Sequence, residues 1–175
     1  MHKKENLIIE ENPITINKKA LMLNNIIILF ASVLVIGCSA PPAFENYQEI
    51  VDETWSLEDT IVSNFPILDT LQSYNFFVNL RNNNNYNYSN LYVFIYTSFP
   101  NGKNMTDTVE CVLAHPDGRW IGSGFGSVYD NRIMYKYKKR FPLTGEYQVR
   151  IIHAMREKEL PGIMDVGFRL EKTTN

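Results

Sequence analysis

Cysteine and histidine are scarce in this sequence, which has two cysteines and three histidines among 175 residues. The two later histidines, His115 and His153, have no second histidine or cysteine at the spacing of a metal site. Basic and acidic residues nearly balance, with 17 Lys and Arg against 19 Asp and Glu, and they form no basic patch of the kind that binds nucleic acid. We therefore expect no metal, no cofactor and no nucleic-acid partner.

The motifs of common enzyme classes are also missing. Ser123 lies between two glycines, but a nucleophile elbow needs G-x-S-x-G at a strand-to-helix turn. The glycines at 122, 124 and 126 do not match the dinucleotide fingerprint, and no helix follows them. The densest acidic group, residues 52–59, has no spacing that pairs two carboxylates for acid and base catalysis. We expect no catalytic residues and no small-molecule substrate, although carboxylates from distant strands can meet in a cleft, which leaves a glycosidase as a third alternative.

The longest apolar run, residues 20–36, follows two lysines and ends at a glycine and Cys38. This is the layout of a lipoprotein signal peptide, in which the thiol is acylated and the chain is cut before it. We predict a signal peptide over residues 1–37, lipidation at Cys38 and membrane residence through the acyl chains. The alternative is an uncleaved transmembrane helix, which needs about 20 apolar residues, whereas this run is shorter and contains two asparagines.

Residues 38–44 are small and proline-bearing, which suits a short tether that reaches about 20 Å when extended. Residues 45–175 are expected to form a single domain, because a chain of this length builds one core. Cys111 is the thiol that remains after lipidation, so no internal disulfide is predicted. Its apolar neighbours favour a buried hydrophobe over a reactive nucleophile.

Apolar and polar residues alternate with a period of two through the domain. The alternation predicts strands over 74–80, 147–151 and 166–170, and aromatic and β-branched residues add strands near 49–57, 91–98, 108–114 and 134–141. Turn signals rich in glycine, proline and asparagine separate them. We predict an all-β fold, an antiparallel β-sandwich of jelly-roll or immunoglobulin-like type with about seven to nine strands and little helix.

Surface chemistry leaves two questions open. Five aromatic residues crowd 86–96, and Trp55 and Trp120 sit beside polar residues. Exposed aromatics on a β-sandwich stack on sugars or anchor a protein partner, whereas buried ones fill the core. The basic cluster at 136–140 could face phosphate headgroups, but on a strand such a cluster is more often a solvated edge that discourages aggregation.

Several short segments carry a family resemblance through their order and spacing: Trp55, 81–82, 86–91, 99–102, 107–109, 113–114, 117–124, 141–142, 145–147, 155–156 and 160–167. In these segments the chain resembles the gliding-motility lipoprotein GldH family of the Bacteroidetes, from about Tyr47 to Glu171. The resemblance implies a non-enzymatic accessory lipoprotein of the envelope machinery that moves surface adhesins, a process coupled to type IX secretion. Its partners would be other proteins of that machinery.

The resemblance carries over no catalytic residue. Its segments at 117–122 and 155–167 suggest a partner surface, with Arg119 and Trp120 in the first and Met155, Arg156 and Asp165 in the second. The alternative is that both segments are turns whose glycines the fold demands.

The residues after Cys38 lack the acidic group that surface lipoproteins of this phylum tend to carry, which favours a periplasm-facing protein. Three Asp-Thr-apolar tripeptides resemble the O-glycosylation acceptor of the phylum and make Thr60, Thr70 and Thr108 candidate modification sites. The alternative to a protein-binding role is a carbohydrate-binding β-sandwich module of the envelope.

Overall fold

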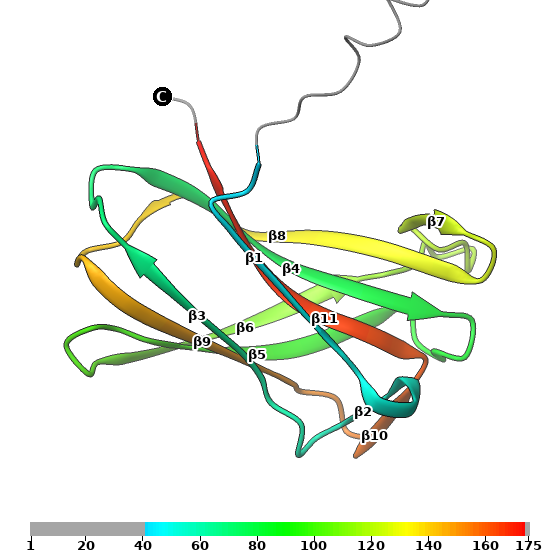
Figure 1. Cartoon of the computed structure of the whole chain (residues 1–175). Helices are drawn as coiled ribbons and strands as arrows, with labels where there is room; N and C mark the ends of the chain where they lie inside the picture. The colour runs from blue at the N-terminus through cyan, green and yellow to red at the C-terminus, as the bar shows by residue number, and fades with distance from the viewer. Residues whose placement is uncertain (1–40, 174–175) are drawn as a thin grey trace, which may run out of the picture. The chain divides into compact units, whose positions relative to one another are not determined.

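The computed structural model describes residues 41–173, and its regular secondary structure is almost entirely antiparallel β-strand (Figure 1). The strands are β1 (Phe44–Glu49), β2 (Thr54–Ser56), β3 (Ile61–Ile67), β4 (Ser73–Asn83), β5 (Asn90–Ser98), β6 (Asn104–Val112), β7 (Ser123–Phe125), β8 (Val128–Arg140), β9 (Gly145–His153), β10 (Glu159–Pro161) and β11 (Ile163–Lys172). The one helical segment among the described residues is a 3₁₀ turn, η1 (Val51–Glu53), so no helix there is long enough to cross a membrane.

Two sheets form the sandwich. Their strand orders are β1-β11-β4-β8-β7 and β3-β9-β5-β6, and a separate ribbon pairs β10 with β2. β2, β7 and β10 have three residues each, and the other eight strands are longer. Counted along the chain, the first, eighth, third and sixth of these longer strands form one sheet, and the second, seventh, fourth and fifth form the other. This interleaving is the jelly-roll arrangement, which settles the choice between the two predicted sandwich types.

The core lies between the two sheets and is rich in aromatic rings. Phe65 on β3 stacks on Phe168 of β11 with ring centroids 5.5 Å apart, and it also stacks on Tyr147 of β9 with ring centroids 6.1 Å apart. Trp55 and Leu160, on the β2–β10 ribbon, are fully buried and extend the core at the end away from the start of β1. Trp55 therefore fills the core instead of offering a surface for sugars.

The predicted sandwich and its longer strands are confirmed, but one predicted strand is wrong. Residues 49–57 do not run as a strand, because Asp52 and Glu53 adopt positive φ values of 53° and 50° in η1 and divide β1 from β2. β3 was not predicted, although Ile61, Ser63, Phe65 and Ile67 alternate inward. The predicted signal peptide and Cys38 lie outside the described residues, and β1 begins at Phe44.

Candidate functional site: a notch at the free edge of β8

The long strand β8 has a partner along only part of its outer edge. β7 pairs three residues, Ser123–Phe125, with Val128–Asp130, whereas β4 pairs with β8 over nearly its whole length on the other side. From 131 to 140, no other strand of residues 41–173 covers the side of β8 that faces away from β4. An open edge of this kind presents backbone N–H and C=O groups that another strand can bind.

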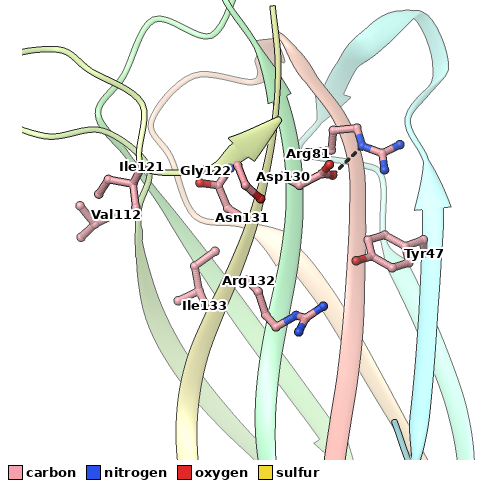
Figure 2. A pocket seen from close by; sticks show the side chains of 10 residues that line it. Tyr47, Arg81, Val112, Ile121, Gly122, Asp130, Asn131, Arg132 and Ile133 are labelled. Carbon is pink, nitrogen blue, oxygen red and sulfur yellow. Dashed lines mark hydrogen bonds and ion pairs between the residues drawn. The ribbon is translucent and has the colours of Figure 1, made fainter. Parts of the chain in front are cut away.

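A notch of about 660 Å³ opens beside the first half of β8, next to the residues that pair with β7 (Figure 2). Its lining comes from both sheets and from the segment before β7: Tyr47, Arg81, Val112, Ile121, Gly122, Ser123, Asp130, Asn131, Arg132 and Ile133. Figure 2 shows Val112 and Ile121 on one side and Arg81 and Tyr47 on the other, with β8 between them. The notch therefore has an apolar side and a charged side.

Gly122, just before β7, and Gly124, within it, bring the backbone of this segment against β8. A Cβ on Gly122 would lie 2.8 Å from the Asn131 side-chain oxygen and 2.9 Å from the Asp130 carbonyl oxygen. A Cβ on Gly124 would lie 1.9 Å from the Val128 carbonyl oxygen. Gly122 and Gly124, which do not match a dinucleotide-binding motif, are thus needed because the backbones approach closely here.

Arg81 organises the charged side of the notch. Its Nε donates to Asp130 Oδ1 at 2.7 Å, and its Nη1 donates to Asp165 Oδ2 at 3.1 Å. The hydrogen bond to Asp130 raises the pKa of Arg81. One guanidinium therefore binds both carboxylates and joins β4 to its two neighbouring strands.

Asn131 places an unsatisfied acceptor on the notch wall. Its side chain is 7% exposed, and its Nδ2 donates to Asn82 Oδ1 at 2.9 Å. Its Oδ1 has no hydrogen-bond partner within residues 41–173. This oxygen packs against Gly122, and an unsatisfied buried acceptor costs about 1–3 kcal/mol.

Two of the predicted partner residues lie in the turn just before the notch. Trp120 is half-buried, its indole N–H donates to Asn84 Oδ1 at 3.1 Å, and its ring lies 5.5 Å from that of Tyr129. Arg119 is exposed and donates from Nε to Asp117 Oδ2 at 2.8 Å, which holds the pKa of Asp117 below its usual range. Trp120 anchors the turn, and Arg119 stays available at the surface.

The other three predicted residues fall in two places. Asp165 joins the notch through Arg81, whereas Met155 and Arg156 line a separate cleft of about 510 Å³ beside Tyr88 and Tyr92. Among the hydrogen bonds and ion pairs of residues 41–173, none joins Met155 or Arg156 to the other three. The five residues thus do not form one cluster.

Sequence reasoning missed Arg81, Asp130 and Asn131 as site residues. Asp130 and Asn131 read as a turn signal, but they lie inside β8, and Arg81 reads as an outward strand residue. The strand register places Arg81 opposite both Asp130 and Asp165. The alternation of apolar and polar residues predicts that Arg81 faces outward, but it does not reveal which strands pair with β4 on either side.

The remaining candidate residues are placed as follows. Cys111 is fully buried, and burial raises its pKa to about 12, which confirms a packed thiol. Thr60 and Thr108 are exposed, and Thr70 is half-buried. Among residues 41–173, no group of three or more His, Cys, Asp or Glu side chains gathers as metal ligands would.

Comparison with known proteins gives matches over most of the chain. A family model described as GldH lipoprotein matches residues 42–170. The gliding motility lipoprotein GldH homolog of Christiangramia forsetii is 36% identical over 156 residues, which cover 85% of this chain and 95% of that protein. The gliding motility lipoprotein GldH of Flavobacterium johnsoniae is also 36% identical over 156 residues, covering 85% and 96%.

One solved structure, dimeric latent PorU from Porphyromonas gingivalis, aligns with 78% of this chain but only 14% of its own. Its identity of 9% and TM-score of 0.33 are too low to carry an argument.

Proposed function

The chain belongs to the GldH lipoprotein family, and from this membership we propose that it is an accessory protein of the gliding and type IX secretion machinery that acts by binding another protein. The relatives are gliding-motility lipoproteins, which places the chain at a membrane of the cell envelope. The open edge of β8 with its notch is the observation that supports a binding role. We further propose that the domain faces the periplasm and that Cys38 carries the lipid.

The free edge fits an extended protein segment. Residues 131–135 offer about the length of an ordinary strand, and added strands bind through main-chain hydrogen bonds while side-chain pockets give specificity. Beyond them, Lys136 Nζ pairs with Asp107 Oδ2 at 2.5 Å, and Lys138 has a positive φ of 46°. Lysines and bulges of this kind protect an edge from pairing. The open part of the edge is therefore the part beside the notch.

Exposed apolar side chains surround the open part. Val112 is 51% exposed, Ile121 48% and Met134 46%, while Phe125 at the tip of the β7–β8 hairpin is 96% exposed. Apolar groups gathered at one edge mark an interaction site more often than a solvated surface. The bound segment would place an apolar side chain against Ile121.

Substitution of Ile121 tests this function in the native bacterium. Ile121→Asp puts a charge on the apolar side of the notch without touching the core, and it should abolish spreading on agar while protein level and thermal stability stay normal. Val62→Asp is the matched control, because Val62 is also exposed but lies on β3 in the other sheet. Normal spreading of the Ile121→Asp strain would refute the binding site.

A photoreactive residue at position 121 identifies the partner and tests the mode of binding. It should crosslink to one envelope protein in wild-type cells, and the crosslink should disappear when Met134 is replaced by proline, which cannot donate to an added strand. A deletion strain with normal motility would refute the whole role.

The carbohydrate-binding alternative depends on exposed aromatic rings. Trp120, the strongest candidate from the sequence, has its N–H engaged by Asn84 and packs beside Tyr129, which weakens this reading. Glycan binding that disappears in Trp120→Ala would nevertheless favour a carbohydrate module over a protein-binding role.

A further inference from the structure

One end of the sandwich gathers both ends of the described chain. β1 starts there at Phe44, opposite Leu170 near the end of β11, and β4 starts there at Ser73, opposite Arg140 at the end of β8. Figure 1 shows that the β3–β4 and β8–β9 connections lie on the same side as these two chain ends. We call this region, formed by residues 41–44, 68–72, 138–144 and 172, the proximal end.

The proximal end exposes two leucines in the β3–β4 connection. Leu68 is 85% exposed and Leu71 is 73% exposed, which makes them two of the most exposed large apolar side chains among the described residues. The Asp69 carboxylate accepts a hydrogen bond from the Leu71 backbone N–H at 2.7 Å, so the turn has a defined shape. A cleft of about 290 Å³ beside Leu68, lined by Phe44 and Phe65 among others, extends the apolar surface.

Cations lie at the same end of the sandwich as these leucines, since Arg140 pairs in register with Ser73 and Lys172 lines the cleft beside Leu68. Lys138, Lys139, Arg140 and Lys172 are exposed at the proximal end, and none of the four forms an ion pair within residues 41–173. The exposed carboxylates nearby are those of Asp69 and Glu146, so positive charge prevails. Apolar groups ringed by Lys and Arg are the surface pattern of proteins that rest on a bilayer.

The short stretch of chain between Cys38 and the domain indicates that the bilayer is what covers this surface. Cys38 precedes Pro41 by three residues, and three residues span at most about 11 Å. If acyl chains hold Cys38 at the membrane, the proximal end is the part of the domain that must lie nearest the bilayer.

We propose that the proximal end docks on the membrane, with Leu68 and Leu71 at the boundary of headgroups and acyl chains and the four cations against anionic headgroups. The proposal rests on anchoring at Cys38, which belongs to the proposed function. It adds that the domain has one fixed face toward the bilayer instead of turning freely on its tether.

Site-specific labelling can test the docked orientation because the cysteine of residues 41–173, Cys111, is fully buried, and Cys38 is blocked if it carries the lipid. Leu71→Cys introduces a reactive thiol at the proximal end. Val51→Cys is the matched control, since Val51 is 79% exposed but lies in η1 at the opposite end of β1. Each lipidated variant is labelled with a polarity-sensitive fluorophore and reconstituted into vesicles of phosphatidylglycerol and phosphatidylcholine that contain brominated acyl chains.

The label at position 71 should shift to shorter wavelength and be quenched several-fold more strongly than the label at position 51. Equal quenching at the two positions, or none at either, would overturn the docking proposal. Co-flotation of both variants with the vesicles is measured in the same samples, so a failure of the lipid anchor is seen separately.

A charge reversal tests the role of the cations. Lys139→Glu together with Lys172→Glu should reduce the bilayer-contacting population at position 71 in anionic vesicles, by about fivefold for each cation lost from the surface. The same variant should behave like the parent in vesicles of phosphatidylcholine alone. Unchanged quenching in anionic vesicles would refute headgroup recognition by these cations.

Discussion

Acidification is expected to destabilise the fold through His153. This side chain is fully buried, its ring meets that of Trp55 edge-on at 5.3 Å, and burial lowers its pKa. Glu159 and Asp59 favour the charged ring, but their effect is smaller than that of burial. His153 is thus neutral in the folded protein near pH 7.

The sign of the effect follows from proton binding. A histidine whose pKa is lowered by folding binds more protons when the chain is unfolded, so stability is highest above the unfolded pKa of about 6.5 and falls as the pH drops below it. If the folded ring stays neutral, the loss between pH 7.5 and pH 5.5 approaches about 1.4 kcal/mol. Most carboxylates titrate below this window.

Urea unfolding at pH 7.5, 6.5 and 5.5 measures this loss, with His153→Leu as the comparison. The variant keeps a side chain of similar size against Trp55 but cannot take up a proton. Its free energy of unfolding should be nearly flat across the window, whereas that of the parent should fall. Parallel curves for the two proteins would refute the assignment of the pH dependence to His153.

Three further outcomes are expected. Gly162→Ala should lower the free energy of unfolding, measured in urea, by more than the roughly 1–2 kcal/mol typical of a left-handed residue, because the new Cβ would lie 2.2 Å from the Tyr86 nitrogen. Gly102→Ala is the control: Gly102 has a similar φ but open space around it, so this variant should lose only about 1–2 kcal/mol. Cys111 should resist thiol reagents in the folded protein and react after unfolding, as absorbance at fixed pH would show. Mass spectrometry should find Thr70 unmodified in the native protein, since a glycan there would hold Leu71 off the bilayer.

The fold could be predicted where burial follows a simple period. β4, β9 and β11 alternate cleanly in sequence and were placed correctly, because each has a face in the core. β3 was missed because Pro66 and two short polar residues weaken its pattern, although its proline faces out on an edge strand, where proline is tolerated. The break at residues 52–53 could not be foreseen, because two successive non-glycine residues with positive φ are uncommon.

The candidate site was less predictable than the fold. The notch exists because β7 pairs with only three residues of β8 and leaves the rest of that edge uncovered. How far one strand covers another is a property of the assembled sheet. Trp120 was singled out from the sequence and does lie beside the notch, but Arg81 and Asn131 gain their positions from strand register.

The length of β8 sets a distance between membrane and partner. Arg140 belongs to the proximal end, and Arg132 lies on the notch wall, eight residues earlier on the same strand. At about 3.3 Å per residue, the two sites stand up to about 26 Å apart along one rigid element. β8 would then act as a spacer that holds a bound segment at a fixed height above the bilayer, and a longer tether would change that height only if the proximal end were released.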